Sequence, residues 1–492
     1  MPSSAVPPTH SNSWEPRPKD IKTYPHFDRR VSREELTRLA NDPGRVARHA
    51  FLPLLLFYEE WTRFRKHNGP IKKKKRPIRY ASRTDAAIYA RYRAYLAERY
   101  EAELIRRGIQ RVPIAYRAIP TETNSGANKS NIDFAHDAFT AIRTFGECLV
   151  TVVDISSYFE SLDHDLIRLQ WESLIGHPLT PDHAAVFKSV TRYSVVDLTQ
   201  AKKRLGLLEK NRVGPRKHAR QRKIDTLRSN RYLQLCDMKD FRSKICGQGG
   251  ACRSLVATNG RNYGIPQGTP ISDVIANFYL LDFDQEVNDW VTSRNGVYHR
   301  YSDDIIVIMP DTASTDPHDT KRYLQSQISK FGEQLKVQDK KVVIGRFSSS
   351  STNQSYNREF GKASRNGLEY LGFAFDGEKV TLKDATMSNA WRKLRRRSYG
   401  FAWRYVKRYR DKGEVWIRHN YPHSQLLRSI IQIVSYGQDT GPESWTFLRY
   451  VKRSRKKFAD FDTRFLSQTR KYKQQALALI LADLDKAIKR HG

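Results

Sequence analysis

Two adjacent carboxylates, Asp303 and Asp304, stand in the stretch 300–309, whose sequence is RYSDDIIVIM. Residues 297–301 and 305–309 favour strands, so we predict a tight hairpin with Ser302, Asp303 and Asp304 at its tip. Two carboxylates this close raise each other's pKa, and a bound divalent cation is the usual reason for tolerating them. A lone Asp-Asp pair is more often a solvated acidic turn, so the assignment depends on other stretches of the chain.

Asp154 is the third candidate carboxylate, because it lies near the end of a strongly β-branched stretch, LVTVVDI, at residues 149–155. A carboxylate there is not a core residue, although capping a helix is the alternative role. Residues 263–270, YGIPQGTP, form a Gly/Pro loop that opens a helix, with Thr269 expected as its N-cap. Neighbouring antiparallel strands would bring Asp154 and Asp303 together around two Mg²⁺ ions roughly 4 Å apart. Such ions activate a 3′-hydroxyl and stabilise leaving pyrophosphate.

The composition points to a polyanionic partner. Lys and Arg number 87 against 52 Asp and Glu, a formal net charge of +35, and 492 residues suffice for two or three domains. The longest apolar runs fall far below the roughly 20 residues of a membrane span, and the N-terminus has no apolar signal region. Four cysteines without a CxxC pair argue against a disulfide framework. We therefore expect a cytoplasmic protein that binds nucleic acid and no membrane.

The C-terminal part of the chain carries much of this charge. Residues 385–492 contain 25 Lys or Arg and 8 Asp or Glu, so they contribute +17 of the total. Aromatic residues alternate with these cations, a pattern that suits helices contacting a phosphate backbone. The last helix repeats Leu477, Leu481, Leu484 and Ile488, which we expect to be core. A subunit contact, and hence a homo-oligomer, is the alternative interpretation.

Five sequence blocks, in order along residues 76–373, make the chain resemble the reverse transcriptases. The blocks are VTVVDISSYFESLD, GIPQGTPIS, YSDDIIVI, LKVQDKKVVI and LEYLGF. The resemblance implies an α+β right-hand polymerase, with fingers, a palm whose antiparallel sheet carries the acids, and a basic all-α thumb. The expected division is a flexible arm at 1–30, N-terminal helices and fingers at 31–145, a palm at 146–384 with a basic insertion at about 199–260, and the helical domain at 385–492.

The resemblance also assigns roles to individual residues. Asp154, Asp303 and the supporting Asp304 match the catalytic metal ligands, together with the carbonyl of Ile155, and two Mg²⁺ ions are implied, for which Mn²⁺ can substitute. Phe159 matches the aromatic residue that rejects a 2′-hydroxyl, which implies deoxynucleoside triphosphates as substrates. The remaining expected contacts are Gln267, Gly268, Lys341, Arg76, Arg79 and Arg117 with the nucleotide, and Tyr301, Leu368, Tyr370 and Gly372 with the primer and template.

The branch of the family is inferred by exclusion. The NAxxH block and VTG triplet of retron enzymes are absent from the sequence, and the last 100 residues do not look like an intron maturase or endonuclease region. The chain therefore looks most like the bacterial defence-associated, or abortive-infection, group. That implies cDNA synthesis from a dedicated non-coding RNA template in antiphage defence. The alternatives are a catalytically vestigial RNA-binding or splicing-assisting protein, and a group II intron-like or retron-like reverse transcriptase.

Overall fold

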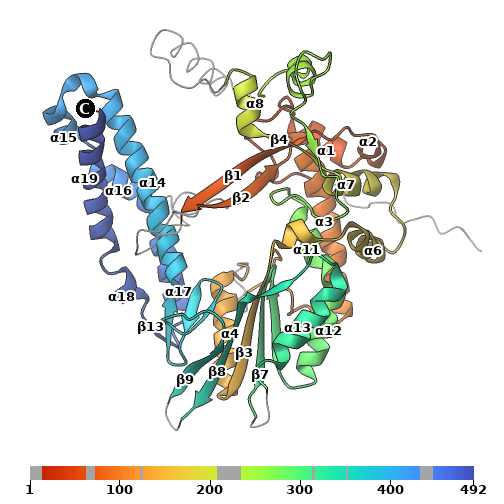
Figure 1. The fold of residues 1–492 in the computed structure, drawn as a ribbon, viewed down its shortest axis with the longest axis vertical. Helices are drawn as coiled ribbons and strands as arrows, with labels where there is room; N and C mark the ends of the chain where they lie inside the picture. The colour runs from red at the N-terminus through yellow and green to blue at the C-terminus, as the bar shows by residue number, and fades with distance from the viewer. Residues whose placement is uncertain are drawn as a thin grey trace, which may run out of the picture. The chain divides into compact units, whose positions relative to one another are not determined.

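The chain contains helices and three β-sheets, divided between two compact units (Figure 1). The computed structural model describes residues 14–62, 73–121, 126–207, 234–312, 316–350, 353–432 and 447–491. One unit comprises Met1–Tyr116, Ile155–Val287 and Gln325–Lys336, and the other comprises Arg117–Asp154, Asn288–Leu324 and Val337–Gly492. We call the first the loop unit and the second the acid unit, and each is described by itself.

A five-stranded sheet forms the centre of the acid unit, with strand order β6-β7-β3-β8-β9. The predicted hairpin is confirmed as β6 (Val297–Tyr301) and β7 (Asp304–Pro310). β3 (Cys148–Ile155) pairs antiparallel with β7, and both strands are buried almost continuously, as expected of runs of β-branched residues. β8 (Val337–Ser349) and β9 (Gln354–Phe360) complete the sheet, and α4 (Asn131–Phe145) shares a core with β3 and β7.

A second sheet of the acid unit lies beside the C-terminal helices. Its strands are β10 (Leu368–Tyr370), β11 (Phe373–Phe375), β12 (Lys379–Leu382) and β13 (Asp462–Thr463). The helices are α14 (Asp384–Arg408), α15 (Glu414–Asn420), α16 (His423–Gln432), α17 (Phe447–Lys457), α18 (Phe465–Thr469) and α19 (Tyr472–His491). The C-terminal domain expected to be all-α thus also contributes one short strand, β13, which pairs with β12.

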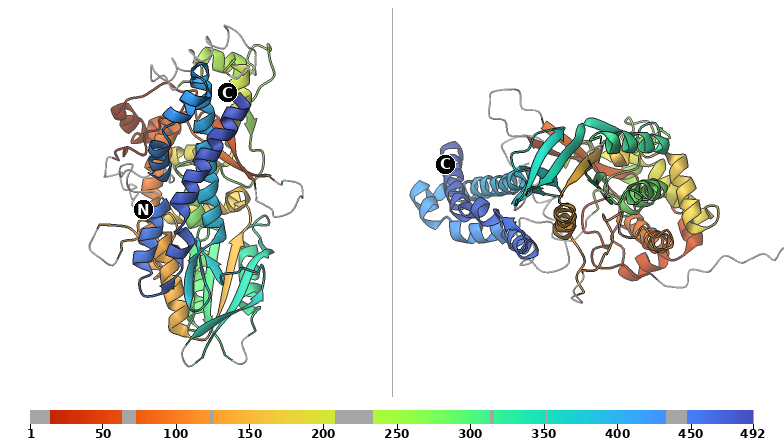
Figure 2. Two further views of the ribbon diagram at one scale, coloured as in Figure 1. Left: turned by 90° about the vertical axis from the view of Figure 1, so that its left-hand side faces the viewer. Right: turned by 90° about the horizontal axis from the view of Figure 1, so that it is seen from below.

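Helices α14 and α19 lie side by side and share one apolar core (Figures 1 and 2). The expected stripe on α19 is corrected in part, because Leu481 is 43% exposed. The buried side of α19 passes instead through Ala476, Ile480, Leu484 and Ile488. Alanine is less hydrophobic than leucine, so Ala476 does not stand out in an apolar sequence pattern. Its small side chain nevertheless allows another helix to approach closely.

The loop unit is built on a four-stranded sheet with order β2-β1-β4-β5. Its strands are β1 (Leu54–Thr62), β2 (Lys73–Tyr80), β4 (Ser194–Asp197) and β5 (Ala257–Thr258). The basic run that begins at residue 71 therefore continues as the edge strand β2, where Arg76 pairs with Glu59 and Lys75 with Glu60 of β1. Lysines on an edge strand discourage pairing with further strands.

The helices of the loop unit mostly follow the expected signals. They include α1 (Arg33–Ala40), α2 (Pro43–Ala47), α3 (Arg83–Arg106), α5 (Tyr158–Ser161), α6 (His164–Ile175), α7 (Pro181–Thr191), α8 (Leu198–Arg204), α10 (Met238–Asp240) and α11 (Ser272–Tyr279). α12 (Leu281–Thr292) and α13 (Asp319–Ile328) each continue from one unit into the other. Ser32 caps α1, as predicted, and accepts a hydrogen bond from the Glu35 amide. Thr269 is not the N-cap of α11, which begins at Ser272 after Ile271.

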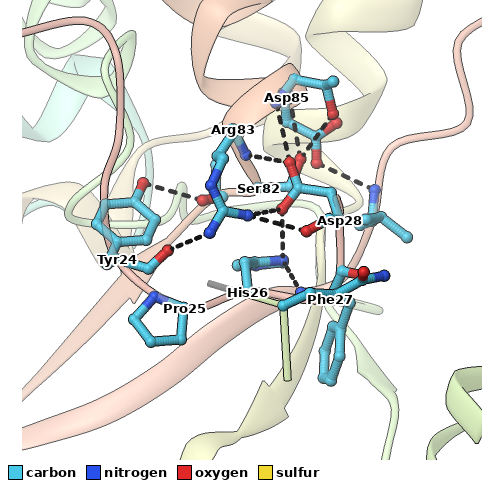
Figure 3. Close-up of polar contacts among 12 residues, drawn as sticks. Tyr24, Pro25, His26, Phe27, Asp28, Ser82, Arg83 and Asp85 are labelled. Carbon is cyan, nitrogen blue, oxygen red and sulfur yellow. Dashed lines mark hydrogen bonds and ion pairs between the residues drawn. The ribbon is translucent and has the colours of Figure 1, made fainter. Parts of the chain in front are cut away.

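The N-terminal segment differs from the expected flexible arm, because residues 24–28 pack into the loop unit (Figure 3). The Arg83 guanidinium donates to the Asp28 carboxylate at 2.9 Å and to the Tyr24 carbonyl at 2.8 Å. Burial, reinforced by the Arg83 charge, lowers the pKa of His26 to about 3. Desolvation makes a buried ion pair costly unless its geometry is well fixed, so the Asp28–Arg83 pair requires this segment to be held in place. Residues 1–13 lie outside the described residues.

The same segment joins the insertion to the sheet. The Leu235 amide donates to the His26 carbonyl at 2.7 Å, and Phe27 shares an apolar cluster with Leu55 of β1 and Phe241. The flanks of the basic insertion at 199–260 are thus part of a folded core, whereas its most basic stretch, 208–233, lies outside the described residues. No helix in the described part of the chain has the length and apolar character to cross a membrane.

Candidate active site

The register of the five-stranded sheet places the carboxylates together. Asp154 of β3 is the direct partner of Asp304 of β7, and Tyr301 pairs with Asp304 across the hairpin. This leaves Ser302 and Asp303 as a two-residue turn, in which Ser302 has a φ of 60°. Directly opposite residues of antiparallel strands have Cβ atoms about 4.5–5.5 Å apart. Two of the three predicted acids therefore face each other, with the third beside them at the turn.

A buried arginine supports this turn. Arg300 is 0% exposed, and its guanidinium donates to the Ser302 carbonyl at 3.3 Å. Tyr301 points differently, since successive residues of a strand face opposite sides, and its ring lies edge-on to Phe134 at 6.2 Å. Sequence reasoning assigned no role to Arg300. The alternation of side chains along β6 could have indicated that Arg300 is buried, because Arg300 and Tyr298 are two residues apart and lie on the same, buried face.

The three carboxylates repel one another electrostatically. Burial, followed by the charges of Asp303 and Asp154, raises the pKa of Asp304 to about 7. Lys383 and Lys341 oppose this rise. Lys341, on β8, also forms an ion pair with Asp154, and both side chains are more than a third exposed. The sequence indicated Lys341, but it gave no signal for Lys383, which precedes α14 outside the quoted blocks.

The donor chemistry of this site fits a hard divalent cation. Carboxylate oxygens are the ligands that Mg²⁺ prefers, and a cation would relieve the mutual repulsion that raises the pKa of Asp304. Within the described ranges, no three His, Cys, Asp or Glu side chains converge closely enough to hold a metal as they stand. Binding would therefore require Asp154 to exchange Lys341 for the ion. The carbonyl of Ile155, the last residue of β3, follows Asp154 in the chain.

The expected primer-contacting hairpin is present, but two of its side chains face inward. Leu368 is 0% exposed and Tyr370 2% exposed, and both belong to the core of the acid unit. Their side chains therefore pack in the core and position the hairpin, and contact of the hairpin with a primer stays a prediction. The reason is strand alternation, because Leu368 and Tyr370 are two residues apart and share the core face.

The tip of that hairpin is held by its backbone. Leu371 and Gly372 both have positive φ angles, 42° and 97°. The Leu371 carbonyl accepts a hydrogen bond from Asn131 at 3.0 Å. The Gly372 carbonyl accepts two more, from the Lys383 amide and the Thr386 hydroxyl, each at 3.0 Å. The sequence indicated Gly372 but not the three donors, of which Asn131 lies 240 residues from its acceptor along the chain.

The loop unit brings together a second set of predicted residues. The Arg79 amide donates to the Gln267 carbonyl at 2.9 Å, and the Ile265 amide donates to the Phe159 carbonyl at 2.8 Å. Gly268 has a φ of 115°, and a Cβ there would lie 2.5 Å from the Arg79 carbonyl oxygen. Glycine is required on both counts. Arg79, Phe159, Gln267 and Gly268 thus form one connected cluster.

Two of the three predicted phosphate-clamping arginines, Arg76 and Arg79, lie on β2. Arg79 forms an ion pair with Glu160 at 3.0 Å. Arg76 is exposed on β2, three residues away along the strand. Arg117 is the first residue of the acid unit, so the structure does not join it to the other two. Contact of these three arginines with the nucleotide therefore stays a prediction.

Two solved structures resemble the fold distantly. Apo telomerase from Candida tropicalis, truncated from its C-terminal domain, has a TM-score of 0.38 and 10% identity, over 69% of this chain and 58% of its own. Telomerase from Candida albicans in complex with a fragment of telomeric RNA has a TM-score of 0.34 and 12% identity, over 91% and 62%. The chain thus spans under two thirds of either relative. No protein-family model and no curated protein matches the sequence.

Proposed function

We propose that the protein is an RNA-directed DNA polymerase, a reverse transcriptase. The observation that carries this proposal is the pairing of Asp154 with Asp304 across two buried strands, with Asp303 at the adjoining turn. Three carboxylates in this arrangement, one with a pKa raised to about 7, favour a cation-dependent reaction over a structural role. Nucleotide addition needs that kind of site, because most of its catalysis comes from positioning and charge neutralisation.

Asp154 and Asp303 would hold two Mg²⁺ ions, with Asp304 and the Ile155 carbonyl in support. When bound, the ions supply activation of the primer 3′-hydroxyl and stabilisation of the leaving pyrophosphate. The chain's own residues supply the setting. Arg300 holds the turn on which Asp303 stands. Lys341, once released from Asp154, is free to pair with the triphosphate, and its ammonium can donate a proton to the leaving group.

The cluster in the loop unit supports deoxynucleotide selection. Phe159 is a large ring on α5, and its backbone carbonyl is fixed by the loop that carries Gln267 and Gly268. A rigid ring in contact with the sugar would clash with a 2′-hydroxyl, so it would reject ribonucleotides. We propose that the Gln267–Gly268 backbone lies against the incoming nucleotide, and that Arg79 assists its phosphates.

We propose further that the enzyme acts in bacterial antiphage defence, copying an associated non-coding RNA. The absence of the retron and intron-type sequence features supports this role by exclusion, and the +17 charge of residues 385–492 suits a stably bound RNA. Sequencing the nucleic acid that co-purifies with the protein would identify template and product together. A single recurrent RNA with a complementary DNA is the expected result, and a random sample of cellular RNA without complementary DNA would argue against it.

The direct test is primer extension on an RNA template with Mg²⁺ and deoxynucleoside triphosphates. Asp303→Asn should reduce incorporation by at least about 10³-fold, because it removes a carboxylate that would hold the cations needed to neutralise charge at the reaction centre. Asp319→Asn is a matched control, since this acid is 57% exposed at the start of α13. Wild-type rates in Asp303→Asn would overturn the proposal. A wild-type protein that binds RNA but extends no primer would instead favour the vestigial RNA-binding alternative.

A further inference from the structure

A groove opens on the C-terminal helices, outside the carboxylate site. It has a volume of about 350 Å³ and lies between α14 and the junction of α18 with α19. The side chains that matter for its chemistry are one indole, one phenol ring, two cations and two neutral polar groups. These are Trp391, Tyr472, Arg470, Lys471, Ser467 and Gln475. We call this the α14–α19 groove.

The aromatic wall of the groove is braced from behind. Tyr472 is 2% exposed and packs against Phe447, with ring centroids 5.2 Å apart. Trp391 leans on Tyr472 with centroids 4.7 Å apart and planes inclined by 48°, and it remains only partly buried. Among the described residues the Trp391 indole makes no hydrogen bond. A fixed, partly open ring with a spare N–H donor is suited to a flat polar ligand.

The cations of the groove have no internal carboxylate partner. Arg470 and Lys471 are both exposed, and neither forms an ion pair with any residue in the described part of the chain. The residues lining the groove include no Asp or Glu. The positive charge of Arg470 and Lys471 is therefore not neutralised within the groove. This favours binding of an anion from outside the chain.

We infer that the α14–α19 groove binds one nucleotide of a single-stranded nucleic acid. The base would stack on Trp391, and the adjoining phosphates would lie against Arg470 and Lys471. Aromatic stacking combined with cations along the backbone is how sequence-tolerant single-strand sites work. The volume is at the lower end of the range for small-molecule pockets, so it suits one unpaired nucleotide and not a duplex. The proposal does not depend on polymerase activity, because binding is measurable without nucleotide addition.

The test measures the affinity of the full-length protein for a fluorescent oligouridine of about 12 nucleotides by anisotropy. Arg470→Ala with Lys471→Ala should raise Kd about tenfold near 0.1 M salt, and should reduce the salt slope by about 1.4, or 0.7 for each lost phosphate contact. Lys489→Ala with Arg490→Ala removes equal charge at the other end of α19, roughly 28 Å away at 1.5 Å per residue. That control should change Kd less than about threefold. Equal losses in both double variants would overturn the site.

Trp391 separates stacking from charge. Trp391→Ala should raise Kd for the single strand about tenfold and leave the Kd for an RNA duplex of equal length unchanged, since paired bases cannot enter the groove. Trp391→Phe, which retains a ring, should stay within about threefold of wild type, so a folding defect in the alanine variant would not leave the question open. Unchanged single-strand affinity in Trp391→Ala, or equal losses for strand and duplex, would contradict the inference. Displacement of the strand by equimolar uridine monophosphate would assign the groove to a free nucleotide instead.

Discussion

The two parts of the acid unit handle charge in opposite ways. In the five-stranded sheet, a few acids are placed by strand register, and Asp154 lies directly opposite Asp304 in the pairing of β3 with β7. In residues 385–492, a large excess of cations is spread over helices, and most of the described cations are exposed. Catalytic side chains need exact placement, whereas affinity for a polyanion can be summed over many approximate contacts.

The largest expected contrast between the two parts concerns one arginine from each. Arg300→Leu should lower the free energy of unfolding by about 3 kcal/mol, because it removes a fully buried group and leaves the Ser302 carbonyl without its donor. Arg396→Leu, at an exposed position of α14, should change it by less than about 0.5 kcal/mol. Urea unfolding of both variants measures this. Equal changes in the free energy of unfolding for the two variants would contradict the distinction between a precisely positioned cation and one of many surface cations.

A smaller effect is expected from the ring that we propose as the sugar gate. Phe159→Ala should raise incorporation of ribonucleotides relative to deoxynucleotides by roughly 30-fold, because the clash with the 2′-hydroxyl disappears. Single-nucleotide incorporation with each triphosphate in turn gives the ratio. Tyr158→Phe is a useful neighbour control, since Tyr158 is buried and its hydroxyl contacts the Ala276 carbonyl. An unchanged ratio in Phe159→Ala would remove that residue from the gate.

The smallest of these effects concerns loop placement. Gly268→Ala should lower kcat/KM for a deoxynucleotide about tenfold, because its Cβ would lie 2.5 Å from the Arg79 carbonyl and displace the loop. Gly249→Ala is the matched control, since Gly249 also has a positive φ, 87°, but a Cβ there meets nothing within 4 Å. Steady-state kinetics of both variants would compare them. Equal losses would mean that backbone strain, and not the contact with Arg79, decides the outcome.

Strand propensity and alternation made the sheet readable from sequence. The β-branched runs on either side of Asp303 predicted β6 and β7, and they predicted that Asp154 lies on a neighbouring strand. The exact pairing of Asp154 with Asp304 could not be predicted, because register depends on which strands meet. Lys383 and Asn131 were missed for a related reason, since each reaches the site or its hairpin through contacts between residues far apart in sequence.

Charge patterns were less informative about structure. A run of basic residues predicts no particular element, yet residues 73–76 lie on the edge strand β2, where pairing with Glu59 and Glu60 offsets part of their charge. The N-terminus was predicted to be flexible to residue 30. Asp28 instead accepts a hydrogen bond from Arg83, and the segment around it packs into the loop unit. Aromatic residues among the cations of the C-terminal helices indicated a phosphate contact. The groove at Trp391 could not be predicted from that pattern, because α14 and the α18–α19 junction meet only in the folded domain.

The central claim is that the carboxylates paired across β3 and β7 form a divalent-cation site. Titrating Mg²⁺ into the protein by calorimetry, in buffers with different ionisation enthalpies, tests it most directly. Because the pKa of Asp304 is raised to about 7, its carboxyl is roughly half protonated at pH 7, and a cation must displace that proton. We expect release of about half a proton per site at pH 7, affinity that rises with pH through about 7, and no release in Asp304→Asn. Binding that is unchanged in Asp154→Asn, or that releases no proton in the wild type, would contradict the claim.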